Sequence, residues 1–296
     1  MSAAKFDAKP VLLVRAADNE GDAAALEAAG LATVIDPYLT VQPLSGQAGL
    51  DAAGKLLART GLLQRGDWLV ATSLNGLRSW GILAWQLTRR SAVAEAMADA
   101  KTRGVRFAAI GPATAAKFAE FGIRDVFTPT EAYGEALAEE LLAEAAPEAA
   151  SIGRPVRALI PAGNLAMKTL VTGLTNAGWQ VASEVVYETA IIPEQPSSVA
   201  RAIKGDFSAV LLRSPSAARA LVHWTLKVSE GGQVSVGTQL PPEIANLPVV
   251  CGGRTTAAVA ESLGLKVAAI TADTQPTTIA NTLVSVVANS TQQKGS

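Results

Sequence analysis

The sequence contains one cysteine, Cys251, and one histidine, His223, among its 296 residues. A single cysteine excludes an internal disulfide and any metal site built from a cysteine cluster. A lone histidine without a cysteine partner nearby argues against a zinc site and against a catalytic triad. We therefore expect no bound metal. We interpret Cys251 as a small buried residue at a strand end and His223 as a residue on a helix surface.

Charged and aromatic residues are also scarce. Only 17% of the residues are charged and 5% are aromatic, and 25 basic residues nearly balance 26 acidic ones to give a net charge of −1. No run of five or six like charges occurs. Neither a broad surface for a phosphate backbone nor an aromatic platform for bases is indicated, so we expect no nucleic-acid partner.

Signals for a membrane or a cofactor are missing as well. No apolar run reaches the roughly 18 residues of a membrane helix, and the opening MSAAKFDAKP has no apolar core like that of a signal peptide. We therefore expect a cytoplasmic protein without membrane contact. The phosphate-loop spacing GxxxxGK followed by Ser or Thr and the dinucleotide fingerprint GxGxxG are both absent, so no cofactor is expected.

What the sequence does have is a regular alternation of strand and helix patterns. Hydrophobic residues make up 49% of the chain, enough for substantial cores. Short apolar runs typical of buried strands lie at 11–14, 31–35, 68–71, 105–110, 125–127, 156–160, 179–187, 207–212, 249–251 and 266–270. Helical patterns with short loops separate most of them. The alternation predicts an α/β protein with mostly parallel sheets, and the length predicts about two domains.

Two motifs occur twice in the chain. WLVATSLNGLRSW at 68–80 corresponds to AVLLRSPSAARAL at 209–221, and GPATAAKFAEFG at 111–122 corresponds to GRTTAAVAESLG at 253–264. Ser73 and Ser214 are 141 residues apart, and Gly111 and Gly253 are 142 residues apart. Two motifs repeated at nearly one offset indicate two copies of one structural unit.

Each repeated motif places Ser, Thr or Gly between a strand and the helix that follows it. In parallel sheets such loops lie at the carboxyl ends of the strands, where ligands collect, and the helix N–H groups there favour carboxylates or phosphates. Ordinary N-capping is the alternative, and both readings can hold because a capped helix still has free N–H groups. Two domains facing each other would present these loops to a shared cleft.

Two further candidates stand alone. Arg15 follows the first strand and could meet an acidic ligand, with simple solvation as the alternative. Tyr187 ends a strand, where a tyrosine more often covers a core than takes part in catalysis. No pairing of a nucleophile with a base is evident. The residues alone therefore favour binding a polyanion and guiding a reactive molecule.

At these motifs the chain resembles the uroporphyrinogen-III synthase family. The resemblance rests on ordered stretches that span most of the chain: VLLVRA at 11–16, VATSLNGL at 70–77, AAIGPATAAKFAEFG at 108–122, PAGNLAMKTLVTGLTNAGWQV at 161–181, VVYETA at 185–190, LLRSPSAARAL at 211–221, GRTTAAVAESLG at 253–264 and DTQPTTIANTL at 273–283. The elements Pro-x-Gly-Asn and Val-Tyr-Glu-Thr are its more specific parts. Asn75 and Arg254 depart from the family pattern, which has a basic residue in some relatives and commonly Pro at these places.

The resemblance implies an exchange of segments between two similar, doubly wound domains. It predicts one discontinuous domain of residues 1–38 plus 189–290 and a second domain of residues 39–188. The polar composition of the last residues separately predicts a disordered tail at 291–296. Extended connections near 37–41 and 187–191 would form a two-stranded hinge, with the ligand cleft between the domains.

The resemblance also implies the reaction and the site. The expected substrate is hydroxymethylbilane, a linear tetrapyrrole with eight carboxylates, which is cyclised to uroporphyrinogen III with inversion of the last pyrrole and loss of water. Transient contact with the upstream hydroxymethylbilane synthase is left open. Tyr187 is expected to be catalytic. The expected substrate-binding residues are Arg15, Thr72, Ser73, Asn75, Gly111, Thr114, Gly134, Asn164, Ser214, Ser216, Gly253, Thr255 and Thr256.

Two other classes of protein fit part of this pattern. A non-catalytic, bilobed tetrapyrrole-binding or regulatory relative would keep the fold, although no DNA-binding or receiver extension is evident. A periplasmic-type solute-binding protein would share the two lobes but would be expected to have a signal peptide. Affinity without turnover would favour the first of these over an enzyme.

Overall fold

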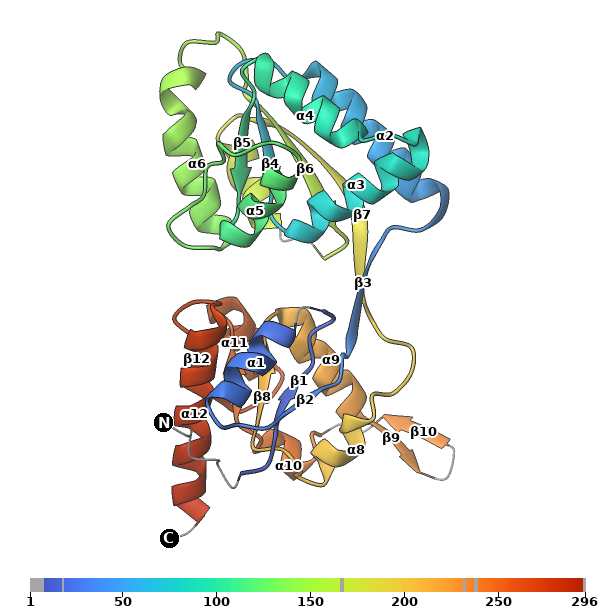
Figure 1. Cartoon of the computed structure of the whole chain (residues 1–296), viewed down its shortest axis with the longest axis vertical. Coiled ribbons are helices and arrows are strands. Elements are labelled where there is room, and N and C mark those ends of the chain that lie inside the picture. Colours follow the sequence, from blue (N-terminus) through green and yellow to red (C-terminus); the bar gives the residue numbers. More distant parts are fainter. Residues whose placement is uncertain (1–7, 18, 166–167, 231–232, 237–238, 295–296) are drawn as a thin grey trace. The chain divides into compact units, whose positions relative to one another are not determined.

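The computed structural model describes residues 8–17, 19–165, 168–230, 233–236 and 239–294. The chain divides into two compact units, one of Met1–Thr40 with Ala190–Ser296 and one of Val41–Thr189, which we call unit 1 and unit 2. The divisions fall after Thr40 and Thr189, where the sequence placed them after residues 38 and 188. Each unit is an α/β structure with its own sheet (Figure 1).

Unit 1 contains a five-stranded sheet in the order β12-β11-β8-β1-β2, with every neighbouring pair parallel. Its strands are β1 (Val11–Leu13), β2 (Thr33–Ile35), β8 (Ala209–Leu212), β11 (Val249–Cys251) and β12 (Val267–Ile270). One face is covered by α1 (Glu20–Ala28) and α12 (Pro276–Lys294). The other is covered by α8 (Ser198–Ile203), α9 (Pro215–Leu226), α10 (Pro242–Ala245) and α11 (Arg254–Ser262). A separate antiparallel pair, β9 (Lys227–Glu230) and β10 (Gln233–Val236), follows α9.

Unit 2 contains the sheet β3-β7-β6-β4-β5. Its strands are β3 (Leu39–Pro43), β4 (Trp68–Ala71), β5 (Arg106–Ala109), β6 (Arg157–Gly163) and β7 (Gln180–Ile191). The core on one face is formed with α2 (Gly46–Leu62), α3 (Leu74–Thr88), α4 (Ala92–Thr102) and α5 (Pro112–Glu120). The core on the other is formed with α6 (Gly134–Ala149) and α7 (Lys168–Asn176).

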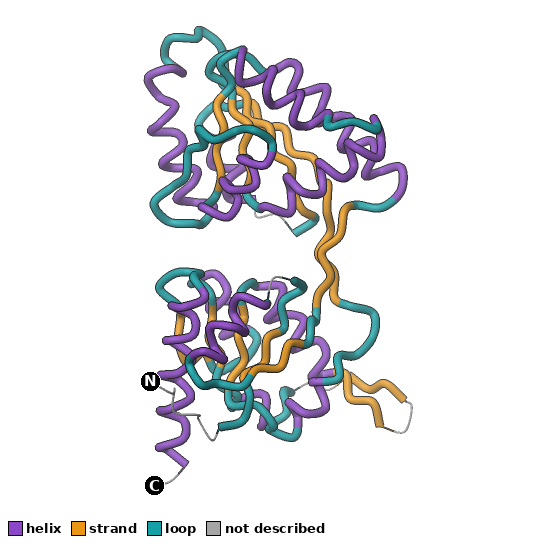
Figure 2. The backbone as a smooth tube through the Cα atoms, viewed as in Figure 1, coloured by secondary structure: helices purple, strands orange, loops and turns teal. Residues whose placement is uncertain are grey.

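The chain passes between the units twice, through β3 and through the end of β7. These two strands are neighbours in one sheet (Figure 2). The Leu44 amide donates to the Val186 carbonyl at 2.9 Å, and the Ile192 amide donates to the Tyr38 carbonyl at 3.2 Å. Residue numbers that rise on one strand while they fall on the other mark an antiparallel pair.

The helices of the described chain follow local sequence signals. In α3, Leu77, Trp80 and Leu83 recur at helical spacing and are buried, while Ser73 caps the start and Arg89 ends the helix in the left-handed conformation. No helix in the described part of the chain is long and apolar enough to cross a membrane.

In the structure α12 continues to Lys294, into the segment where the sequence predicted a disordered tail. Once a helix has formed, each further residue adds a hydrogen bond at little cost, and Gln and Lys are good helix formers. The polar composition of STQQKGS therefore does not end the helix. Residues 295–296 lie outside the described part of the chain.

Candidate functional site

Each sheet has one place where the chain reverses its direction of winding. In unit 1 the chain runs outward from β1 to β2 and then from β8 to β11 and β12 on the other side; in unit 2 it runs from β4 to β5 and then from β6 to β7. Ligands of doubly wound sheets bind outside the carboxyl ends of the strands at this point. The loops after β1 and β8, and those after β4 and β6, are therefore the candidate sites.

In unit 2 the loop after β4 holds Thr72 and Ser73, both half-buried. Ser73 is the N-cap of α3, and its hydroxyl accepts a hydrogen bond from the Asn75 amide at 3.1 Å. The capping interpretation is confirmed here. Only part of the helix start is occupied by this bond, so other N–H groups of the first turn stay available to an anion.

The start of α3 lies directly on β6. A Cβ atom added to Gly76 would come within 2.4 Å of the Pro161 carbonyl oxygen, so the helix backbone touches the strand backbone. Gly163 is two residues beyond Pro161, on the same face of the strand and roughly 6.6 Å further along it. The start of α3 thus contacts β6 two residues before Gly163, the last residue of that strand.

Tyr187 lies against this same place. Its ring fills the space beside Gly163, where an added Cβ would meet the ring at 2.4 Å. The side chain is half-buried and packs against the core formed by α2 and α3. The structure therefore places the Tyr187 ring beside Gly163, at the end of the strand that the start of α3 contacts at Pro161.

Asn164 also lies here, but its side chain has protein partners. Its Oδ1 accepts from the Thr189 amide at 2.9 Å, and its Nδ2 donates to the Thr189 carbonyl at 3.3 Å. Its backbone amide donates to the Tyr187 carbonyl at 3.0 Å. The resemblance implies that Asn164 contacts the substrate, and in the structure these bonds also hold Asn164 to β7.

The remaining candidates of unit 2 lie beside β5. Gly111 is the N-cap of α5, and a Cβ atom added to it would lie 3.3 Å from Cβ of Ala132, in the loop before α6. Gly134 begins α6 and is buried. Thr114 is only 4% exposed, so a ligand at this loop would meet backbone N–H groups before it met the Thr114 hydroxyl.

Unit 1 repeats the capped loop after β8. The Ser214 hydroxyl accepts from the Ala217 amide at 3.2 Å at the start of α9, and Ser216 lies in the first turn, half-buried. Arg15 follows β1, the neighbouring strand. Its carbonyl accepts from the Asn19 side chain at 2.9 Å.

The loop after β11 matches the loop after β5 closely. Gly253 is the N-cap of α11 with an extended backbone, as Gly111 is for α5, and both helices span nine residues. Thr256, like Thr114, is 4% exposed. Thr255 is exposed at the helix start. In each unit the two repeated loops follow neighbouring parallel strands, β4 and β5 or β8 and β11.

One ion pair in unit 1 was not foreseen. The Arg213 Nη1 atom donates to both carboxylate oxygens of Asp22 at 3.0 and 2.8 Å, and Nη2 donates to the Thr274 carbonyl at 3.0 Å. Asp22 is 1% exposed. Arg213 thus joins α1 to the loops after β8 and β12 and is occupied within the unit.

A second unforeseen feature is Thr271, directly after β12. Its side chain is 5% exposed, and its Oγ1 has no hydrogen-bond partner among the described residues. Buried hydroxyl groups are normally paired. No sequence signal marked this residue, because only the fold places it at the carboxyl edge of the sheet.

Reactive side chains do not add a nucleophile or a metal centre within the described ranges. Burial, and to a lesser degree the charge of Glu261, raises the pKa of Cys251 to about 11, so its thiol stays protonated near neutral pH. The ring of His223 packs edge-on against Trp224. Among the described residues no group of three His, Cys, Asp or Glu side chains could hold a metal ion.

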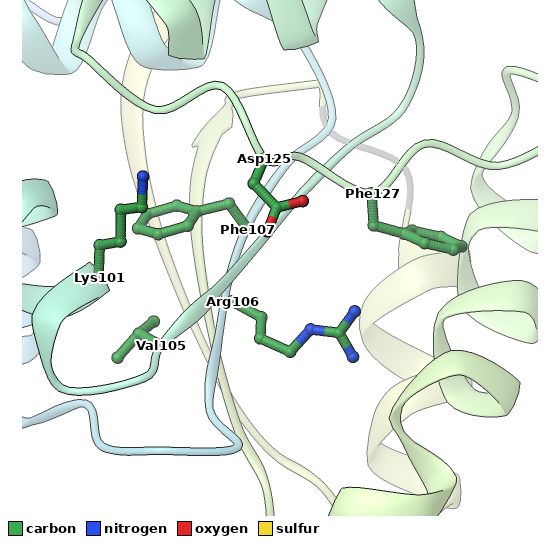
Figure 3. A pocket seen from close by; sticks show the side chains of 6 residues that line it. All are labelled: Lys101, Val105, Arg106, Phe107, Asp125 and Phe127. Carbon is green, nitrogen blue, oxygen red and sulfur yellow. The ribbon is translucent and has the colours of Figure 1, made fainter.

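A small cavity of ≈ 60 Å³ lies elsewhere in unit 2 (Figure 3). It is lined by Lys101, Val105, Arg106, Phe107, Asp125 and Phe127. Arg106 is the first residue of β5, so this cavity lies at the opposite end of that strand from Gly111. It is far smaller than the several hundred Å³ of ordinary ligand pockets. The candidate site is therefore not this cavity.

Known proteins resemble this chain in sequence pattern and fold. A family model described as Uroporphyrinogen-III synthase HemD matches residues 21–279. A mutant uroporphyrinogen III synthase from the extremely thermophilic bacterium Thermus thermophilus has a TM-score of 0.58 and 14% identity, covering 94% of this chain and 99% of that one. The uroporphyrinogen-III synthetase of Helicobacter pylori has a TM-score of 0.53 and 13% identity, covering 94% and 99%. These structural likenesses show the α/β fold. No curated protein matches the chain.

Proposed function

This chain belongs to the uroporphyrinogen-III synthase family, and on that premise we propose that it cyclises hydroxymethylbilane to uroporphyrinogen III. The observation that carries the proposal is the family match, which extends over residues 21–279 and so includes both units. The reaction would make the protein a lyase of porphyrin and heme biosynthesis. We further propose that it acts in the cytoplasm without a cofactor.

The chemistry asks for control of conformation more than for strong acid or base. Loss of the terminal hydroxyl as water leaves an azafulvene cation, which is intrinsically reactive. Unassisted closure joins the ends directly and gives the I isomer, whereas the III isomer requires the last pyrrole to invert through a spiro intermediate. A protein that fixes the geometry of the bound chain therefore selects the product.

Each unit has donors suited to the eight carboxylates of the substrate. The starts of α3, α5, α9 and α11 present backbone N–H groups at the carboxyl edges of their sheets. We propose that these helix starts bind substrate carboxylates, with the hydroxyls of Thr72, Ser216 and Thr255 as additional donors. The Arg15 side chain is proposed to contribute positive charge.

We propose that Tyr187 donates a hydrogen bond from its phenol to the departing hydroxyl group, or orients the ring that bears it. Its half-buried ring beside Gly163, at the carboxyl end of β6, supports this role. Replacement of Tyr187 by Phe keeps the ring and removes the donor. Turnover is expected to fall by roughly 10²-fold, the range typical for loss of one positioned proton donor. Unchanged turnover would remove the phenol from the mechanism.

Product isomer analysis tests the proposed function. Hydroxymethylbilane would be generated by its upstream synthase in the presence of catalytic amounts of this protein, and the oxidised products would be separated by chromatography. The proposal expects many equivalents of the III isomer per protein molecule. If the product remained the I isomer while tetrapyrrole bound to the folded protein, the chain would be a non-catalytic binding relative.

A further inference from the structure

The pairing of β6 with β7 changes at one point. The strands pair residue by residue up to Ala162 and Val185, after which the register shifts and Gly163 pairs with Tyr187. Val186 is therefore an extra residue on β7, which is the definition of a β-bulge. The shift falls immediately before Tyr187.

The bulge changes the side of the sheet on which Tyr187 lies. Side chains of a regular strand alternate between the two faces. Val186 is buried in the core formed with α2 and α3, and Tyr187 packs against that same core, although the two residues are consecutive. In a regular strand, with Val186 paired with Gly163, Tyr187 would lie on the face covered by α6 and α7.

Gly163 provides the space for the ring once the bulge has turned it. A Cβ atom at this position would lie 2.4 Å from Cζ, 2.7 Å from Cε2 and 2.8 Å from the hydroxyl oxygen of Tyr187. Non-bonded contacts of this kind are normally at least about 3.5 Å. Any residue other than glycine would therefore displace the ring or the strand.

Asn164 holds the backbone on both sides of the ring. Its amide donates to the carbonyl of Tyr187, and its side chain pairs with both the N–H and the C=O of Thr189. The side chain thus imitates a strand partner for Thr189, beyond the end of β6 at Gly163. With Gly163 it controls the position of residues 187–189.

We propose that Gly163 and Asn164 are positioning residues that aim the Tyr187 phenol. The catalytic meaning of this inference rests on the proposed function, but the placement itself does not. The Gly-Asn pair is needed at the end of β6 because one residue leaves room for the ring and the next fixes the bulged strand.

The placement can be tested by NMR without any substrate. The chain has only three tyrosines, Tyr38, Tyr133 and Tyr187, so ring-labelled tyrosine gives three sets of signals, and Tyr187→Phe assigns one of them. Gly163→Ala and Asn164→Ala are each expected to shift the Tyr187 signals and leave the other two in place. Unchanged Tyr187 signals in both folded variants would overturn the proposal.

Two further variants distinguish a changed position of the Tyr187 ring from a general loss of protein stability. Asn164→Asp keeps the acceptor for the Thr189 amide, which is the shorter bond at 2.9 Å, and is expected to shift Tyr187 less than Asn164→Ala. Gly61→Ala is the matched glycine control, because its added Cβ meets no atom within 4 Å. If Gly163→Ala does not fold, the two Asn164 variants decide the test alone. Equal Tyr187 signals in Asn164→Asp and Asn164→Ala would contradict the proposal that the Asn164 side chain positions Tyr187 through Thr189.

A double-mutant cycle of enzyme activity tests whether Gly163 acts through Tyr187 in catalysis. A misaimed catalytic group can cost about 10²-fold in rate, so Gly163→Ala is expected to lower kcat by roughly 10- to 100-fold in the wild-type background. Combined with Tyr187→Phe it is expected to cost less than about twofold more, because the phenol it aims is already gone. Equal losses in both backgrounds would show that Gly163 acts independently of Tyr187. If the wild-type protein forms no III isomer, the proposed function fails while the NMR result still decides the placement.

Discussion

Replacing Asp67 by Ala removes a buried charge that joins the two central strands of unit 2. The carboxylate is fully buried and accepts from Arg154 at 2.6 Å and from the side chain of Arg157 at 2.9 Å. It also accepts from the backbone amides of Gln64 at 2.8 Å and Arg157 at 2.9 Å. Asp67 precedes β4 and Arg157 begins β6, so these bonds fix the amino ends of both strands.

The loss of folding stability follows from the donor groups that the substitution leaves without an acceptor. Two backbone amides and two guanidinium groups lose their common acceptor, and removing one partner of a buried ion pair costs about 3–5 kcal/mol. Both arginine side chains are 29% exposed and can recover some hydration, so we take the lower end, ~3 kcal/mol. For a unit of this size that lowers the melting temperature by roughly 6–12 °C.

The effect should depend on pH in a defined direction. Burial acts to raise the pKa of the Asp67 carboxyl, but the hydrogen bonds from Arg154, Gln64 and Arg157 outweigh it and lower the pKa below its usual 3.8. A depressed folded-state pKa stabilises the protein above the unfolded-state pKa, and this contribution is lost as pH falls through the folded-state value. The difference between wild type and Asp67→Ala should therefore be constant above about pH 5 and shrink below about pH 4.

Denaturant unfolding followed by tryptophan fluorescence measures this difference. Four of the five tryptophans lie in unit 2: Trp68, Trp80, Trp85 and Trp179. The control is Asp51→Ala, an exposed carboxylate that accepts a hydrogen bond from Gln47 on the same helix, which should change stability by under about 0.5 kcal/mol. A loss below about 1 kcal/mol for Asp67→Ala, or one independent of pH down to about pH 3, would refute the reasoning.

Two other variants or reactions are expected to behave as follows. Thr271→Val replaces an unpaired buried hydroxyl by a methyl group of similar size, so the melting temperature should rise, by the equivalent of ~1 kcal/mol; a lower melting temperature would mean that the hydroxyl has a stabilising partner. Cys251 has no exposed surface, and its pKa is raised to about 11. It should therefore react with iodoacetamide at about pH 8 only after the protein unfolds, which mass spectrometry would show. Rapid labelling of the native protein would contradict its burial.

The parts of the fold that depend on local sequence could be predicted. Ser73 and Ser214 cap their helices as their place before an apolar helical pattern indicates. The predicted strands at 68–71 and 249–251 form as expected, and the one predicted at 207–212 forms over residues 209–212. The repeated motifs also indicated two copies of one structural unit, and in each unit the two motifs follow neighbouring parallel strands. These features follow from periodicity and capping within a few residues.

The parts that depend on distant partners could not be predicted from spacing. The resemblance implies that Asn164 binds the substrate, but nothing in the sequence indicated that its side chain would pair with Thr189, 25 residues away. The shift of register before Tyr187 has no local signature, since Val185 and Val186 read as ordinary strand residues. The buried bond between Arg213 and Asp22 spans 191 residues. Such contacts exist only once the sheets have formed.

The most direct test of the central claim is the product of a single turnover. Hydroxymethylbilane would be mixed with an excess of this protein, and the ratio of III to I isomer would be measured as the protein concentration is raised. The account predicts that the III isomer rises with protein concentration until it replaces the I isomer. A ratio that stays at the value of the protein-free reaction, with the tetrapyrrole bound, would contradict it.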